Sequence, residues 1–239
     1  MAKTKEKDIF TAIKEDDLEA VRAMLAKDPS LVNSVAPKKP VDTKGMSPLQ
    51  VSLTTNWHRD IADILLDSGA AVNYMEPPEL HIPQAHPVLH DAVSVAIWNS
   101  RRYACVDADD PDNNEFEWKH TKDDADRAYA LLKRMIDMGA DVNAVNNYND
   151  NALSEAIQQA SFLCPQKDLL TGKLYPGLKK TPEMVEDFQR IFRLLIQSGA
   201  DTKSRNSYNK KTIREFYQFY QDGEVWSIYE PVLREFGKV

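Results

Sequence analysis

One phrase closes three hydrophobic segments of this chain, and it constrains the fold more than any other feature. It reads Gly69-Ala70-Ala71-Val72-Asn73, Gly139-Ala140-Asp141-Val142-Asn143 and Gly199-Ala200-Asp201-Thr202, and each copy follows a pair of aliphatic residues. Glycine often ends a helix because it enters the left-handed backbone region without a Cβ penalty. Three such caps with one flanking pattern indicate a helical unit that is used several times.

The residues that open each unit carry a family resemblance. The openings are Ser47-Pro48-Leu49-Gln50, a segment from Pro87 to Ala92, and two asparagine-rich segments that begin at Asn146 and Asn206. Serine before proline favours a helix start, and Asn149 tolerates the left-handed region at the glycine position of its turn. Together with the glycine caps, these openings resemble the ankyrin repeat, whose pattern is Thr-Pro-Leu-His followed by two helices. The chain is most similar to the divergent, stand-alone ankyrin proteins of bacteria.

The resemblance implies an all-α fold: an ankyrin-repeat solenoid of about five helix-turn-helix repeats in a single array. Terminal repeats cover an otherwise exposed face, so the atypical N-terminus and the aromatic-rich segment 212–239 fit capping repeats. The expected boundaries are 1–41 for the N-terminal cap, 42–75, 76–145 and 146–205 for the next three repeats, and 206–239 for the C-terminal cap.

Two repeats carry long insertions between their helices. The segment from Leu49 to Gly69 has the usual ankyrin length, whereas those that end at Gly139 and Gly199 are more than twice as long. The insertions span about 99–122 and 162–182, and we expect them to emerge side by side because insertions within repeats map to one face. The first carries six acids within 107–117, whereas the second carries four lysines.

Two interpretations of the insertions remain open. In one, they lengthen the helices and pack on each other, with their charges solvated at the rim. In the other, the acidic segment with Phe116 and Trp118 is a recognition loop for a basic partner, because aromatic residues supply contact area and charge supplies steering.

For function, the resemblance implies a protein-binding module that is not an enzyme. Ankyrin arrays contact partner proteins through the tips of their turns and the concave face of their first helices. Tyr148 and Tyr208 stand out, since tyrosine is favoured at binding hot spots, although each could also pack along its own turn. The residues expected to bind a partner are Lys44, Met46, Gln50, Asn147, Tyr148, Asp150, Ser154, Ser207, Tyr208, Lys210 and Arg214, with Phe116 and Trp118 from the first insertion.

Composition narrows the class of partner. The net charge of −7 argues against nucleic acid or an anionic membrane, and no apolar run approaches membrane-spanning length. The first residues lack a secretory signal, and Cys105 and Cys164 are expected to be free thiols, so we expect a cytoplasmic monomer that binds another protein. A narrower hypothesis, suggested by some bacterial ankyrin proteins, is an antagonist or immunity protein for a basic partner.

Two alternatives belong to other functional classes. His81, His86 and His90 could form a metal-binding or catalytic site, with Glu79 or Asp91 completing the ligands. Against this, Pro87 interrupts helical spacing, and the resemblance gives His90 a structural role between repeats. We therefore expect no metal and no cofactor. The other alternative is a homo-oligomeric structural protein that associates through its aromatic C-terminal face.

Overall fold

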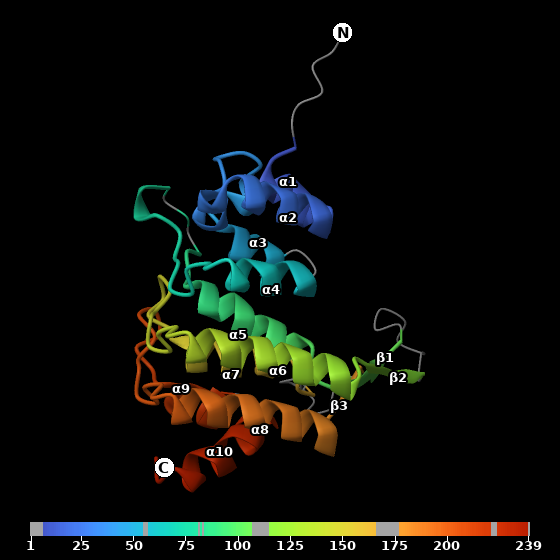
Figure 1. The fold of residues 1–239 in the computed structure, drawn as a ribbon. Helices are drawn as coiled ribbons and strands as arrows, with labels where there is room; N and C mark the ends of the chain where they lie inside the picture. Colours follow the sequence, from blue (N-terminus) through green and yellow to red (C-terminus); the bar gives the residue numbers. More distant parts are fainter. Residues whose placement is uncertain are drawn as a thin grey trace. The chain divides into compact units, whose positions relative to one another are not determined.

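The computed structural model is mostly helical and divides into two compact units, residues 1–91 and 92–239 (Figure 1). The residues that it describes are 7–54, 57–80, 82, 84–106, 115–165, 177–220 and 224–238. The prediction of a mostly helical chain is confirmed, but the described residues also contain a small antiparallel sheet that the all-α expectation omitted.

The first unit is built from paired helices. Asp8 and Asp17 cap the first two helices, since their carboxylates accept hydrogen bonds from the N–H groups of Thr11 and Ala20. α1 packs on α2 and on α3, while α2 packs on α4, so first helices meet first helices and second helices meet second helices. The elements are α1 (Ile9–Lys14), α2 (Leu18–Lys27), η1 (Pro29–Asn33), η2 (Val41–Thr43), α3 (Pro48–Thr54), α4 (Arg59–Asp67) and η3 (Pro78–Leu80), and α5 (Val88–Trp98) begins here.

The helix start predicted at the Ser-Pro motif is confirmed. α3 begins at Pro48, and the Oγ of Ser47 accepts a hydrogen bond from the N–H of Gln50 at 3.2 Å. In return, the N–H of Ser47 donates to Oε1 of Gln50, also at 3.2 Å. This reciprocal pair is a capping box, which satisfies N–H groups that would otherwise lack a partner at a helix start.

The second unit contains longer helices and the strands. Thr121, Asn151 and Thr181 cap α6, α7 and α8 with their side chains. α8 packs on α6, α7 and α10, and Tyr229 of α10 meets Phe192 of α8 edge-on. The elements, after the end of α5, are β1 (Arg102–Cys105), β2 (Phe116–Lys119), α6 (Lys122–Asp137), α7 (Ala152–Leu163), β3 (Leu178–Lys179), α8 (Pro182–Gln197), α9 (Ile213–Tyr220) and α10 (Glu224–Glu235).

All three glycine caps have the predicted left-handed backbone, with φ of 89° at Gly69, 94° at Gly139 and 92° at Gly199. In each, the N–H of the following alanine reaches back to a carbonyl five residues earlier, as from Ala70 to Leu65 at 2.9 Å. This is the hydrogen bond of a Schellman motif. The repeated sequence phrase therefore has one repeated geometry.

Asparagine side chains join each of two caps to the turn before it. The amide of Asn33 donates to the carbonyl oxygen of Gly69 at 3.2 Å and accepts from the N–H of Ala71 at 2.8 Å. In the second unit, Asn143 makes the same two bonds, to the oxygen of Gly199 at 2.9 Å and from the N–H of Asp201 at 2.7 Å. Both units thus use one device to hold successive helix pairs.

The two insertions lie side by side, as predicted, and strands from both pair in one sheet. β1 and β2 form a hairpin from the first insertion, and β3 from the second insertion pairs antiparallel with β1, which gives the strand order β2-β1-β3. Short segments such as Arg102–Cys105 contain β-favouring residues but are too brief for their alternation to be read from sequence. Within the second unit, this sheet lies at one end of helices α6 to α8, and the turns that follow α6 and α8 lie at the other end (Figure 1).

Cys105 and Cys164 are both buried and free of disulfides, as expected. Among the helices that the model describes, none is long and apolar enough to cross a membrane.

Candidate functional site

The turn of residues 146–151 is organised by an asparagine. Oδ1 of Asn146 accepts hydrogen bonds from the N–H groups of Tyr148 at 2.8 Å and Asp150 at 3.0 Å. Asn149 has a positive φ of 64°, which confirms that it takes the position of a turn glycine. The side chain of the first residue thus fixes the backbone that presents Tyr148.

The turn of residues 206–212 is similar, although its left-handed residue comes one position later. Oδ1 of Asn206 accepts from the N–H groups of Tyr208 at 2.9 Å and Asn209 at 3.2 Å. The left-handed residue is Lys210, with φ of 59°. Arg205 supports the turn, because its Nη1 donates both to the carbonyl oxygen of Lys210 and to Glu215, each at 2.7 Å.

Hydrogen bonds tie the two turns together. The N–H of Ser207 donates to the carbonyl oxygen of Tyr148 at 2.6 Å. Two amide side chains cross in opposite directions: Nδ2 of Asn149 donates to the carbonyl oxygen of Arg205 at 2.8 Å, and Nδ2 of Asn206 donates to Asp150 at 2.8 Å. The backbones of the two turns are therefore fixed relative to each other.

The tyrosines of these turns project from the surface. Tyr208 is 88% exposed and Tyr148 is 43% exposed, so Tyr208 does not pack along its own turn. Asn147, Ser207 and Lys210 are also exposed. We call these two turns, residues 146–151 and 206–212, the paired turns.

A small notch of about 110 Å³ opens between the paired turns and helices α7 and α9. It brings together two predicted residues, Asp150 and Ser154, with polar groups that include Asn206 and Lys211. Burial raises the pKa of Asp150, although hydrogen bonds from Asn206 and Asn146 act in the opposite direction. Arg214 lies apart from this notch and lines a different cavity with Tyr229.

The predicted residues of the first unit have a different setting. Gln50 is completely buried, so it has no surface to offer a partner. Lys44 is half-buried and its ammonium donates to the carbonyl oxygen of Leu80 at 2.6 Å. Met46 is also half-buried. The Pro-rich segment that follows α4 thus contacts the turn that should carry a binding tip.

Gln50 belongs to a buried polar cluster with Glu76, His86 and Asp91. Its Nε2 lies 3.2 Å from Oε1 of Glu76 and 3.4 Å from Oδ2 of Asp91. Nε2 of His86 lies 2.8 Å from Oδ1 of Asp91, and its Nδ1 lies 2.7 Å from the carbonyl oxygen of Gln84. The side-chain amide of Gln50 thus links two buried carboxylates.

The charge of His86 partly balances the two carboxylates of this cluster, Glu76 and Asp91. Burial lowers the pKa of His86, but the hydrogen bond and charge of Asp91, the carbonyl of Gln84 and the charge of Glu76 outweigh burial and raise the pKa to about 10. His86 is therefore protonated at neutral pH and neutralises part of the buried negative charge.

The structure describes two of the three histidines of the metal-site alternative, His86 and His90. The ring of His90 stacks on that of His86 with centroids 6.3 Å apart. No group of three His, Cys, Asp or Glu side chains with metal-binding geometry occurs in the described part of the chain. His81 lies outside the described residues.

The insertion sheet gathers aromatic rings on one face. Tyr103 of β1 lies opposite Trp118 of β2, and their ring centroids are 5.3 Å apart. Phe116 stacks on Tyr103 at 5.6 Å. Trp118 is 49% exposed, so the two predicted insertion residues lie together at a solvent-accessible face. Of the acids predicted to accompany them, Asp107, Asp109, Asp110 and Asp112 lie outside the described residues.

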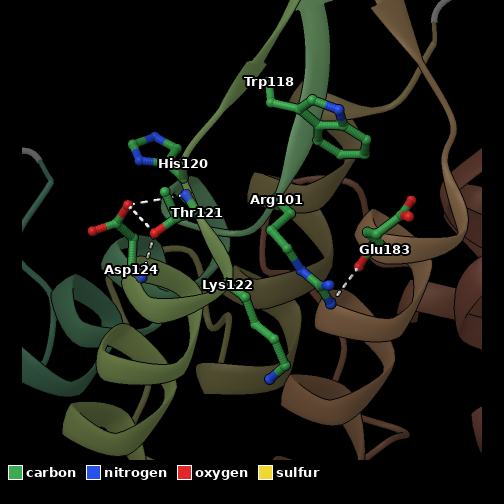
Figure 2. Close-up of a pocket in the computed structure, with 7 residues that line it drawn as sticks. All are labelled: Arg101, Trp118, His120, Thr121, Lys122, Asp124 and Glu183. Atoms are coloured by element: carbon green, nitrogen blue, oxygen red, sulfur yellow. Dashed lines mark hydrogen bonds between the residues drawn. The ribbon is translucent and has the colours of Figure 1, made fainter.

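Trp118 also lines a cavity of about 490 Å³ between the sheet and the starts of α6 and α8. Figure 2 shows its lining, with Lys122 and Asp124 from α6, Glu183 from α8, and Arg101 between them (Figure 2). Lys122 pairs with Asp126 at 2.6 Å, and Asp124 accepts from the N–H and Oγ1 of Thr121 at 2.9 and 2.8 Å. Lys122 and Asp124 are thus both paired with neighbouring side chains.

Arg101 in this cavity is fully engaged by α8. Its side-chain Nε and Nη2 donate to the carboxylate of Asp187 at 3.0 and 2.9 Å. Its backbone N–H donates to the same carboxylate at 2.9 Å. The side chain of Asp187 is 1% exposed. The hydrogen bonds that Arg101 donates to Asp187 raise the pKa of its guanidinium. Arg101 therefore acts as an anchor for the first insertion.

Several residues that shape these surfaces were not among the predicted binding residues. Tyr103 and Lys179 face the predicted aromatic pair, and Asn146 and Asn206 organise the paired turns. The asparagines were visible as a repeated first residue of the turns, which is a usable signal for side-chain-capped turns. No local signal marked Tyr103 or Lys179, because their roles depend on strand pairing.

No family model matches the chain, and no curated protein matches it significantly.

Proposed function

We propose that this chain is a divergent ankyrin-type array that binds a protein partner through the paired turns of its second unit. The observation that carries the proposal is the pair of exposed tyrosines, Tyr148 and Tyr208, on turns that are hydrogen-bonded to each other. A fixed backbone with exposed aromatic anchors loses little conformational entropy on binding, so more of the contact energy becomes affinity.

The array part of this proposal is supported by repeated geometry. Of the ten α-helices in the described residues, α1 packs on α2, α3 on α4, α7 on α8 and α9 on α10. Left-handed glycine caps close three of the second helices, and Asn33 and Asn143 make the same two bonds to the next cap. One unit repeated along the chain explains both features.

Direct capture tests the binding proposal. Tagged full-length protein is passed through a lysate of cells that produce it, and retained proteins are identified by mass spectrometry. The affinity of the retained protein is then measured for wild type and for Tyr148→Ala/Tyr208→Ala. We expect a loss of about tenfold or more, because two central tyrosines each contribute more than 1 kcal/mol at typical interfaces.

Phe162→Ala provides a matched control. Phe162 is an exposed aromatic residue, at 51%, on α7 outside the paired turns. The proposal requires that this variant keep the wild-type affinity and that all variants keep the wild-type melting temperature. A partner bound equally well by the double tyrosine variant would reject the paired turns as the site.

A further inference from the structure

The aromatic face of the insertion sheet already holds a cation. Lys179 of β3 places its Nζ 3.8 Å from the ring centroid of Phe116 and 5.5 Å from that of Tyr103. The faces of aromatic rings carry negative potential and attract an ammonium group at such distances. This face, formed by Tyr103, Phe116 and Trp118, is called the aromatic face below.

The resident cation is held weakly enough to exchange. Lys179 is exposed, and among the described residues no carboxylate forms an ion pair with it. Its partners are two rings at a water-exposed surface, where cation–π attraction is modest. β3 itself is held by backbone pairing to β1, since Tyr103 is the register partner of Lys179 and Ala104 that of Leu178. The ammonium can therefore leave the rings while the sheet stays paired.

Trp118 offers further capacity. Indole is the strongest cation acceptor among the aromatic side chains. Trp118 is 49% exposed, and no described lysine or arginine lies over its ring. The aromatic face thus has one position that Lys179 occupies and one ring, that of Trp118, over which no described cation lies.

We propose that the aromatic face binds a lysine or arginine side chain of the partner protein, which displaces Lys179 from the rings. The inference rests on the proposed protein-binding function and names the chemistry of one contact. Charge favours this occupant, because the chain carries a net charge of −7 and the first insertion has six acids within 107–117. Lys179 is then an internal competitor that lowers the affinity for basic partners.

Pentalysine is the probe, with pentaglutamate as its opposite, in calorimetric titrations of the full chain. Lys179→Met removes the competitor and keeps the aliphatic length, so it should bind pentalysine about fivefold more tightly than wild type, the factor expected for one exposed cation–π contact. Lys179→Arg keeps the cation and should match wild type. Phe116→Leu/Trp118→Leu in the Lys179→Met background should lose the gain.

Lys119→Met controls for net charge. Lys119 lies next to Trp118 in β2, so it points to the opposite face of the sheet, where it pairs with Glu117. This variant changes the charge by the same amount without touching the aromatic face. An equal gain in Lys119→Met and Lys179→Met would overturn the inference, as would Lys179→Met binding no better than wild type.

The paired turns separate this inference from the proposed function. Tyr148→Ala/Tyr208→Ala should leave pentalysine binding unchanged, because those tyrosines lie outside the aromatic face. Both proposals expect this double variant to lose partner capture and to keep pentalysine binding. If partner binding depends on the tyrosines but the aromatic face binds no cation, only the inference about the aromatic face is rejected, and the proposed function stands.

Discussion

At the scale of single residues, the left-handed positions of the paired turns differ in what their side chains contribute. Asn149 and Lys210 have φ of 64° and 59°, and a residue with a Cβ is strained there by about 1–2 kcal/mol. The amide of Asn149 compensates through its hydrogen bond to Arg205 at 2.8 Å. The exposed side chain of Lys210 makes no hydrogen bond to the described residues.

Glycine substitutions should therefore have opposite effects at these two positions. Lys210→Gly relieves strain and should raise the free energy of unfolding by about 0.5 kcal/mol, after the added freedom of the unfolded chain is subtracted. Asn149→Gly also loses a hydrogen bond, so it should lower the free energy of unfolding by about 1 kcal/mol. Urea denaturation of both variants measures the difference. Equal losses at both positions would show that Lys210 is not strained.

His86 makes stability depend on pH in the alkaline range. Its folded pKa of about 10 lies above the ordinary value near 6.5. The folded state therefore binds this proton more tightly than the unfolded state. The stabilisation is fully present below about pH 6.5 and is lost as the pH rises through about 10.

We expect the free energy of unfolding to fall between pH 7 and pH 10, by an amount on the order of a few kcal/mol. His86→Gln should be less stable at pH 7, because it leaves Asp91 without its cation, and its stability should depend much less on pH. His120→Gln is the control, since burial lowers the pKa of His120, helped by the charge of Arg102. Parallel pH profiles for wild type and His86→Gln would contradict the assignment.

At the scale of elements, Arg101 fastens the start of the first insertion to α8. Asp187 is completely buried, so its carboxylate depends on Arg101 and on Arg190, whose Nη2 lies at 3.3 Å. Removing one partner of a buried pair leaves a desolvated charge, which costs about 3–5 kcal/mol. Exposed pairs contribute about 0–1 kcal/mol.

Arg101→Met should therefore destabilise the chain by about 3 kcal/mol, somewhat less than a full loss because Arg190 remains. Arg193→Met breaks the more exposed pair with Glu235 and should cost less than about 1 kcal/mol. Arg101→Met/Asp187→Leu should recover much of the loss, because no buried charge then remains. The measurement is urea denaturation of the three variants, and similar losses in the two single variants would refute the anchor role.

Sequence reasoning predicted the elements that depend on local signals. The caps at Gly69, Gly139 and Gly199 were predictable because a left-handed residue after a hydrophobic stripe has a local cause. That the two insertions lie side by side was predictable from repeat topology. The strands themselves were not, because β1 and β3 become strands by pairing across distant sequence.

The candidate site was predictable to a similar extent. Tyr148 and Tyr208 were identified from their turns, and they are exposed. The burial of Gln50 and the covering of Lys44 depend on the Pro-rich segment after α4, whose path has no repeat counterpart. The cation on the aromatic face depends on a contact between two insertions, which no local pattern encodes.

At the scale of the whole molecule, the C-terminal aromatic residues bear on self-association. Tyr217 and Tyr229 are 7% and 1% exposed, because they pack inside the chain. Burial also raises the pKa of both phenols. These side chains are therefore unavailable as an oligomer face.

We accordingly expect a monomer of 27.2 kDa in sedimentation velocity at micromolar concentration. The net charge of −7 adds repulsion between copies, so raising the salt concentration is the stringent condition. A mass at least twice this value at both salt concentrations would restore the homo-oligomer alternative. The same experiment with Tyr148→Ala/Tyr208→Ala would then show whether the paired turns mediate that association.

The position of β1 between β2 and β3 has a consequence for anyone who grafts new recognition loops onto this scaffold. The middle strand is shared, so neither insertion can be replaced alone without leaving unpaired backbone amides on the other. Both insertions must be replaced together, and the strand register that pairs Tyr103 with Lys179 must be kept. A set of variants that changes only the residues between β1 and β2 would keep the pairing of β1 with β3 and still change the surface beside it.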